Sequence, residues 1–318
     1  MSDNLNKKVL LIGAGQMAVD YHKVLKALNC DITTVGRSEN SATSYREKTG
    51  SEIITGGIDA FLRQNKQAFD AVIVAVGMEQ LAPTTIQLIN NKFLNILIEK
   101  PAGMNEVEIR NLAQSATQFK ANVFVAYNRR FYSSVLKAKE IIELDGGVTS
   151  FNFEFTEWSH IIEPMEKKAG IKENWLLGNS THVIDLAFYL GGKPSEISCY
   201  AAGKLSWHDK AVFTGAGKTK DDVLFSYQAN WDAPGRWGVE ILTKKSRLIL
   251  RPMEDLQLQL KGSVAINKVE IDNTLDKDFK PGLFLQTKQF LTGNISEFKT
   301  IKEQAEMCDT YNHIAKGY

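Results

Sequence analysis

A glycine pattern near the start of the chain follows a short apolar segment. Residues 8–12 (Lys-Val-Leu-Leu-Ile) run into Gly13, Gly15 and Ala18 in the spacing G-x-G-x-x-A. The first glycine permits a tight turn after a strand, the second lets the backbone approach a phosphate, and the small third residue allows a helix to pack closely. The N–H groups at the helix start attract the phosphate. The pattern therefore predicts a dinucleotide-binding turn, with an incidental glycine-rich turn as the alternative. The residues expected to hold the cofactor there are Gly13, Gly15, Gln16 and Met17.

The end of the second expected strand bears on the choice of dinucleotide. The strand over 31–35 is followed by Gly36, Arg37 and Ser38, with no acidic residue before Glu39. An acid at this position accepts hydrogen bonds from the ribose 2′-hydroxyl of NAD, whereas arginine accommodates the 2′-phosphate of NADP. The guanidinium of Arg37 offers paired donors and Ser38 a hydroxyl. We therefore predict NADP, with NAD as the alternative and an exposed turn arginine as the purely structural interpretation.

Strands and helices alternate through the first third of the chain. Continuous apolar runs are typical of strands buried in a parallel sheet, and the segments between them have helical spacing. The expected strands cover 8–12, 31–35, 71–76, 95–98 and 121–126, and the expected helices about 16–29, 81–90 and 106–119, the last capped by Asn105. This order predicts a doubly wound parallel sheet that binds ligands at the carboxyl ends of its strands. At those ends stand Gly13, Val76, Gly77, Glu99 and Lys100.

The pattern changes after about residue 127. A helix over about 133–144 is followed by an alternating segment, a helix near 181–190, and extended segments from 196 to 260 separated by turns. Such alternation is typical of a largely antiparallel sheet. We predict an α/β protein with a dinucleotide-binding Rossmann domain over 1–126 and a second α/β domain with an open, largely antiparallel sheet over 127–318. Helical spacing returns from about residue 283, and these helices are expected to pack back on the first domain. The cleft between the two domains is the default active site.

Length and charge exclude several classes of partner. The 318 residues suffice for about two domains. With Lys+Arg 38 against Asp+Glu 37 the net charge is +1, so no overall field attracts nucleic acid or an anionic membrane. Residues 1–8 are polar, and no apolar run reaches the ~20 residues of a membrane span. We expect a cytoplasmic protein.

The cysteines and histidines do not indicate a metal centre. Cys30, Cys199 and Cys308 lie far apart, lack C-x-x-C spacing and are odd in number, which argues against a disulfide framework or a zinc site. The histidines have no metal-ligand spacing either. We expect reduced thiols and no metal.

Three segments together resemble the Gfo/Idh/MocA oxidoreductases. They are the glycine turn over 13–18, Glu99-Lys100-Pro101 at a strand end, and residues 178–185 (Gly-Asn-Ser-Thr-His-Val-Ile-Asp) opening a helix. Residues 127–131 (Tyr-Asn-Arg-Arg-Phe) look like the domain junction of that family. The resemblance implies nicotinamide-dependent hydride transfer and a substrate that is a sugar, a nucleotide sugar or a cyclitol. It also implies a homo-oligomer formed through the outer face of the second sheet.

Lys100 is the candidate catalytic residue. Oxidation of a secondary alcohol removes a proton from oxygen while hydride leaves carbon. A lysine whose pKa is lowered by burial can accept that proton as the neutral amine and return it as the ammonium. Glu99 is expected to hold Lys100 or the nicotinamide in place. Pro101 is expected to fix the turn, by a cis bond as the resemblance suggests. The structural alternative is a solvated lysine at a strand end.

His182 and Asp185 are the second set of catalytic candidates. Similar chains carry an acid four residues before this histidine, and here that position is Gly178. The acidic partner of an Asp–His proton relay is therefore missing from its usual place. His182 can still hydrogen-bond the reacting hydroxyl, and Asp185 on the adjoining helix face can orient the imidazole. The alternative is a packed histidine and a structural acid at the start of the helix.

The segment from Trp158 to Trp175 precedes His182 and suits either a lid with aromatic surfaces for a sugar ring or a connecting loop. Arg236 is a weaker candidate for contact with the substrate. The residues expected to contact substrate are Asn128, Arg129, Trp158, His160 and Asn179.

These expectations lead to three hypotheses. The first is an NADP-dependent oxidoreductase for a hydroxyl or ketone of a sugar-like substrate. A cofactor-bound sensor on the same fold is the second, kept open by Gly178. The third is a reductase of a non-sugar acceptor such as an imine or a tetrapyrrole.

Overall fold

The computed structural model describes residues 5–64 and 67–318, so the first four residues of the polar opening stretch lie outside the described residues. The chain divides into two compact units. The first extends to Asn128 and takes in Leu275–Glu306, and the second comprises Arg129–Thr274 and Met307–Tyr318. Leu275–Glu306, which the boundary drawn from the sequence had placed in the second domain, joins the first unit because its strand pairs with that unit's sheet and its helix packs on α1.

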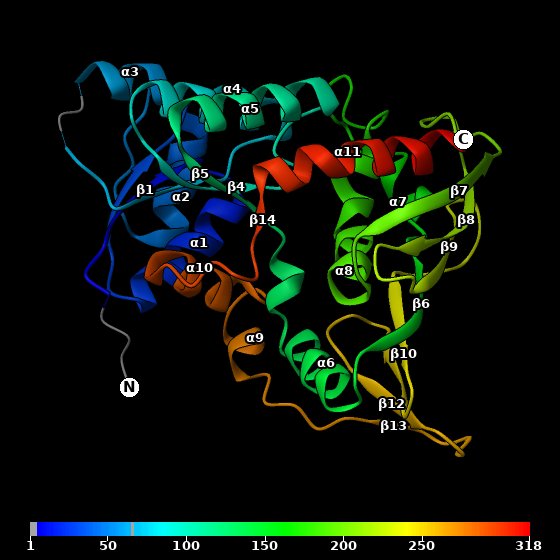
Figure 1. Cartoon of the computed structure of the whole chain (residues 1–318). Coiled ribbons are helices and arrows are strands. Elements are labelled where there is room, and N and C mark those ends of the chain that lie inside the picture. The colour runs from blue at the N-terminus through cyan, green and yellow to red at the C-terminus, as the bar shows by residue number, and fades with distance from the viewer. Residues whose placement is uncertain (1–4, 65–66) are drawn as a thin grey trace. The chain divides into compact units, whose positions relative to one another are not determined.

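The first unit alternates strands and helices along most of its length (Figure 1). Its strands are β1 Lys8–Ile12, β2 Asp31–Val35, β3 Ala71–Val74, β4 Asn95–Glu99, β5 Asn122–Ala126 and β14 Lys299–Thr300. Its helices are α1 Gln16–Ala27, α2 Glu39–Thr49, α3 Gly57–Gln64, α4 Met78–Asn90, α5 Glu106–Phe119, α9 Thr274–Asp278 and α10 Leu283–Thr292. The first residue of α9, Thr274, belongs to the second unit.

The sheet of the first unit confirms the predicted doubly wound fold. Its strand order is β14-β5-β4-β3-β1-β2, with β1 to β5 parallel and β14 antiparallel to β5. Figure 1 shows α4 and α5 on one face of this sheet and α1 and α10 on the other. Strand order reverses between β1 and β3, which is where this fold binds ligands.

Local signals explain where the helices of this unit begin. Asn105 caps α5 as predicted, its side chain accepting a hydrogen bond from the N–H of Glu108 at 3.1 Å. Ser38 caps α2 in the same way. The sequence analysis had not predicted α2 and α3, because α2 is polar around most of its surface and α3 is only 8 residues long.

The second unit is built around an open sheet. Its strands are β6 Val148–Glu154, β7 Pro194–Ala202, β8 Val212–Thr219, β9 Leu224–Asn230, β10 Gly238–Thr243, β11 Ser246–Leu250, β12 Gln257–Leu260 and β13 Ile266–Lys268. The helical segments are α6 Ser133–Leu144, α7 Ser159–Ile162, a π-helical turn Leu176–Ser180, α8 Thr181–Gly191, and the end of α11 Ile301–Lys316; a 3-10 turn Asn128–Phe131 joins the units.

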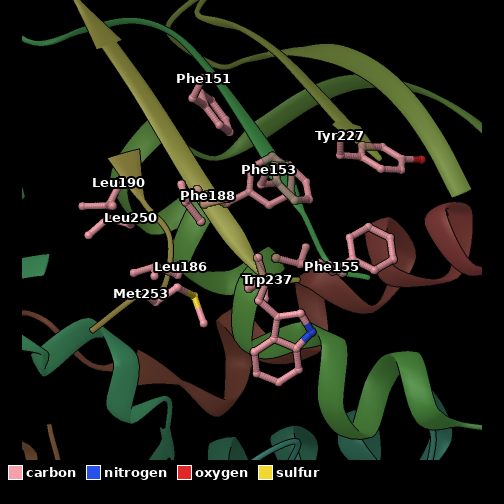
Figure 2. Close-up of a cluster of buried hydrophobic side chains, with 14 of the residues drawn as sticks. Phe151, Phe153, Phe155, Leu186, Phe188, Leu190, Tyr227, Trp237, Leu250 and Met253 are labelled. Atoms are coloured by element: carbon pink, nitrogen blue, oxygen red, sulfur yellow. The ribbon is translucent and has the colours of Figure 1, made fainter. Parts of the chain in front are cut away.

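The strand order of this sheet is β13-β12-β11-β10-β6-β9-β8-β7, and all neighbours are antiparallel except β6 and β9. The predicted largely antiparallel sheet is confirmed. One face carries the core of the unit, which includes Phe151 and Phe153 of β6 and Phe155 just after it, and the helix α8 packs against this face (Figure 2). Phe188 of α8 meets the ring of Phe151 edge to face at 5.9 Å. Among the described residues no helix combines the length and apolarity of a membrane span.

Candidate functional site

A cavity of about 630 Å³ opens at the carboxyl ends of β1, β2 and β3 in the first unit. The structure brings together at this cavity the cofactor residues predicted along the first two strands and after the third. They are Gly13, Gly15, Gln16, Met17, Arg37, Ser38, Val76 and Gly77. Glu99 and Lys100, predicted with them, are not among the described residues that line it.

The glycine turn forms the floor of the cavity. Gly13 has φ +132°, and a Cβ on it would lie 2.2 Å from the carbonyl oxygen of Ala75, so only glycine fits. A Cβ on Gly15 would meet nothing within 4 Å, which leaves its backbone open toward the cavity. Gly15 caps α1 without a side-chain hydrogen bond, and the first turn of α1 holds no acid. This helix start therefore offers free N–H groups and a partial positive charge to a phosphate.

The wall after β2 is basic and hydroxylated. Arg37 is exposed and lines the cavity together with Ser38 and Ser41. The nearest acid along the chain, Glu39, is engaged elsewhere, since its carboxylate accepts hydrogen bonds from Thr55 at 2.5 Å and from Arg46 at 3.3 Å. Chiefly the Thr55 bond, and then Arg46, lower the pKa of Glu39.

Asp59 of α3 is a lining residue that the sequence analysis missed. Its carboxylate accepts a hydrogen bond from the side chain of Gln87. The only sequence signal was an acid in the first turn of a helix that was itself not predicted.

The end of β4 carries Glu99, Lys100 and Pro101, and the peptide bond between the last two is cis, as the resemblance suggested. Tyr21 of α1 donates a hydrogen bond to Oε1 of Glu99 at 2.8 Å. Burial raises the pKa of Glu99, while the charge of Lys100 and the Tyr21 bond oppose that rise. Burial, reinforced by Glu99, also raises the pKa of the Tyr21 hydroxyl. Tyr21 is therefore the buried contact of Glu99, and no sequence pattern had pointed to it.

In the second unit, His182 lies in the first turn of α8, directly after the π-helical turn that contains Gly178. The His182 side chain is buried, and its ring centre lies 6.1 Å from that of Trp237. Single π-helical turns inside helices occur frequently at functional sites.

A second carboxylate that the sequence analysis missed is at the start of this helix. Glu157 lies just beyond β6 and is only 4% exposed. Its oxygens accept hydrogen bonds from Asn179 Nδ2 at 3.0 and 3.1 Å and from Ser180 Oγ at 2.7 Å. The predicted substrate residue Asn179 is thus tied to Glu157.

Asp185 is held by an arginine. Its Oδ2 accepts from Arg130 Nε and its Oδ1 from Arg130 Nη2, both at 2.7 Å, and the two side chains are buried. Burial lowers the pKa of Arg130, but the Asp185 pair outweighs it and the pKa ends above its usual value. The paired geometry is that of a structural ion pair, and the orienting role of Asp185 toward His182 stays a prediction.

The remaining substrate candidates have different surroundings. The side chain of Asn128 donates to the carbonyl oxygen of Pro281 at 2.9 Å within the first unit. Trp158 stacks with His160 at 6.3 Å, and its indole N–H donates to Gly235. Arg129 lies over the ring of Trp237 at 4.8 Å.

Among the described residues no group of histidines, cysteines and acids is arranged to hold a metal ion.

Residues 7–127 match the oxidoreductase family with an NAD-binding Rossmann fold, Gfo/Idh/MocA. This match covers the region with the predicted Rossmann fold and agrees with the family resemblance found in the sequence. No curated protein matches the chain.

Solved structures share the whole fold at low sequence identity. Levoglucosan dehydrogenase in complex with NADH and L-sorbose superposes with a TM-score of 0.79 at 16% identity, covering 98% of this chain and 96% of that one. UDP-N-acetylglucosamine 3-dehydrogenase from Acidithiobacillus ferrooxidans gives 0.74 at 12%, covering 97% and 96%. An oxidoreductase from Agrobacterium radiobacter in complex with NAD+, L-tartaric acid and magnesium gives 0.78 at 12%, covering 98% and 96%.

Replacing Asp185 with asparagine tests the ion pair. The change leaves the buried guanidinium of Arg130 without its counter-charge, which costs about 3–5 kcal/mol of unfolding free energy. Glu140→Gln, which breaks the exposed Lys137–Glu140 pair, is the control and is expected to cost at most ~1 kcal/mol. Urea denaturation followed by circular dichroism measures both. Equal, small losses in the two variants would show that Asp185 does not stabilise the fold.

Proposed function

We propose that this protein is an NADP-dependent oxidoreductase that transfers hydride between the nicotinamide and a hydroxyl or ketone of a sugar-like substrate. The observation that carries the proposal is the cavity of the first unit, where a glycine turn, an open helix start and a basic wall meet. The bound cofactor supplies the hydride acceptor or donor. The fit is physical: the pyrophosphate has free N–H groups, and Gly15 leaves room for it.

Arg37, Ser38 and Ser41 support the choice of NADP over NAD. Together they offer a guanidinium and two hydroxyls at the place where the ribose 2′-position lies in this fold, and Glu39 is turned to Thr55. A 2′-phosphate is well matched to these donors.

Lys100 is proposed as the acid/base. In alcohol oxidation its neutral amine accepts the hydroxyl proton as the C–H bond gives up hydride, and in ketone reduction its ammonium returns that proton. The partly buried Glu99, held by Tyr21, is proposed to orient Lys100 through its neighbouring carboxylate. His182 is proposed to hydrogen-bond the reacting oxygen, whereas Asp185 is assigned to structure.

The sugar-like substrate is supported by the aromatic and hydrogen-bonding residues around His182, and levoglucosan dehydrogenase and UDP-N-acetylglucosamine 3-dehydrogenase share the fold. A sensor that binds NADP without turnover is the second candidate, because Gly178 removes the acid that similar chains carry. A panel of polyols and nucleotide sugars separates the two: a sensor binds NADP and reduces none of it.

We also propose a homo-oligomer formed through the outer face of the second sheet. Tyr200, Val212 and Leu224 are 67%, 36% and 64% exposed, and strand register places all three on that one face. An exposed apolar face on an open sheet is typical of a protein interface.

We propose that the protein is located in the cytoplasm. None of its three cysteines forms a disulfide, which is compatible with that reducing compartment.

Arg37→Ala tests the cofactor assignment. Loss of charge-assisted hydrogen bonds to the 2′-phosphate, worth about 1.5–3 kcal/mol, weakens NADPH binding about ten- to hundredfold. NADH binding is expected to change little, which provides the internal control. Fluorescence titration of both cofactors into both proteins makes the measurement. Tighter binding of NADH than NADPH by the unchanged protein would overturn the assignment.

Lys100→Met tests the acid/base. The substitution keeps the length of the side chain and removes the group that titrates, so the rate of hydride transfer falls by ~10²–10⁴ while NADPH affinity stays close to that of the unchanged protein. Stopped-flow absorbance of NADPH follows the step. A near-normal rate would return Lys100 to a surface role.

His182→Asn tests the proposed contact to the reacting oxygen. The variant retains a polar side chain but loses the imidazole geometry, so turnover is expected to fall about tenfold or more. Steady-state kinetics measure this, with NADPH affinity, which should be unchanged, as the control. Unchanged turnover would contradict the role and strengthen the sensor hypothesis.

A further inference from the structure

Two arginines share one tryptophan in the second unit. The guanidinium carbon of Arg129 lies 4.8 Å from the ring centre of Trp237, and that of Arg236 lies 5.4 Å from the same ring. Arg236 also lies over Trp158, at 4.5 Å. The ring of His182 lies 6.1 Å from Trp237. Two like charges are therefore gathered beside the proposed substrate histidine, and Figure 2 shows Trp237 at one end of the aromatic cluster.

These donors have no acceptor. Nε of Arg129 and Nε1 of Trp237 are both closed off from water and make no hydrogen bond to any described residue, and Trp237 is only 7% exposed. Neither guanidinium, of Arg129 or of Arg236, forms an ion pair with a residue in the described part of the chain. Buried hydrogen-bond donors in native proteins almost always have an acceptor. Two neighbouring donors without one therefore indicate that a ligand supplies the acceptor.

The groups around Arg129 do not offset the effect of burial on the pKa of its guanidinium. Burial is the main cause that lowers the pKa of Arg129, and the charge of Arg236 lowers it further. Tyr132, Glu254 and Glu157 act in the opposite direction without overcoming the burial. The oxygens of Glu157 already accept hydrogen bonds from neighbouring side chains.

We propose that the substrate carries a carboxylate, which binds the guanidinium of Arg129, assisted by Arg236 and the indole N–H of Trp237. This inference rests on the proposed function in one respect, namely that the surroundings of His182 face the substrate. A planar carboxylate matches the guanidinium fork. A single negative charge fits better than a phosphate dianion, because Glu157 and Glu254 already lie close enough to act on Arg129. The substrate class is then a sugar acid, an aldonate or a uronate.

Binding rather than turnover tests the proposal, so its failure is distinguishable from a failure of the oxidoreductase assignment. Calorimetric titration of the NADP-saturated full chain compares D-gluconate with D-glucitol and D-galacturonate with D-galactose, with D-glucose 6-phosphate as the phosphate probe. At least one acid is expected to bind tenfold or more tightly than its neutral partner. Arg129→Met is expected to weaken that acid about ten- to hundredfold and to leave the neutral sugars unchanged. Arg247→Met, which replaces an exposed arginine of β11, is the control and should bind like the unchanged protein.

A second measurement guards against a purely structural effect. Because Arg129 has no acceptor in the protein, Arg129→Met is expected to keep or raise the midpoint of thermal unfolding without ligand, whereas a structural arginine would lower it. Trp237→Phe keeps the ring, removes the N–H, and should weaken the acid by a smaller factor. Acids that bind no better than neutral sugars, saturable binding by none of the probes, or acid binding unaffected by Arg129→Met would each overturn the proposal. So would a preference for the sugar phosphate that depends on Arg129, which would identify a phosphate site instead.

Discussion

The close approach of Gly13 to the end of β3 is the constraint on which the cofactor cavity depends. The N–H of Gly13 donates to Val35 at the end of β2, and the N–H of Ala75 donates to Ile12 at the end of β1. These hydrogen bonds fix the turn between β2 and β3, which flank β1 in the sheet. The strand order reverses at this point, where this fold binds ligands. Any side chain on Gly13 would overlap the carbonyl of Ala75 and force these strand ends apart. The open start of α1 faces the cavity because this turn is so tight.

The same helix links the turn to the end of β4. One turn and a half after the glycine turn, α1 presents the fully buried Tyr21, whose hydroxyl meets the carboxylate of Glu99. Glu99 immediately precedes Lys100, so this partly buried hydrogen bond ties α1 to the residue next to the proposed base. Such a bond is costly to leave unmade inside a protein, because the carboxylate would lose its donor in a low dielectric. The position of Lys100 therefore depends on a residue that never meets the substrate in this scheme.

The sequence predicted those parts of the fold and site that local patterns encode. Apolar runs and the glycine spacing placed the Rossmann strands and brought Gly13, Arg37 and Gly77 to one cavity. Contacts between distant segments had no such signal. Tyr21 and Glu99 are 78 positions apart, and Glu157 meets Ser180 across 23 positions, so only the folded chain joins them. β14 was missed because it is 2 residues long and gains its identity only from pairing with β5. Helical spacing favoured Asp185 as the residue that orients His182, but spacing cannot reveal that Arg130 donates hydrogen bonds to both carboxylate oxygens of Asp185.

Glu157 supplies a carboxylate next to Gly178, at the start of α8. Glycine at 178 supplies no carboxylate to the start of α8. Here the extension of β6 delivers Glu157 to the same helix start, where Asn179 and Ser180 bind it directly after the glycine. A bulkier acidic residue at 178 would add a second negative charge near this buried carboxylate, and two like charges in a low dielectric disfavour each other. Glycine at 178 and glutamate at 157 are thus consistent with each other, and the carboxylate at this helix start comes from the end of the strand. In the substrate site that we propose, Arg129, Arg236 and Trp237 lie beside His182, and the two guanidinium groups favour an anion.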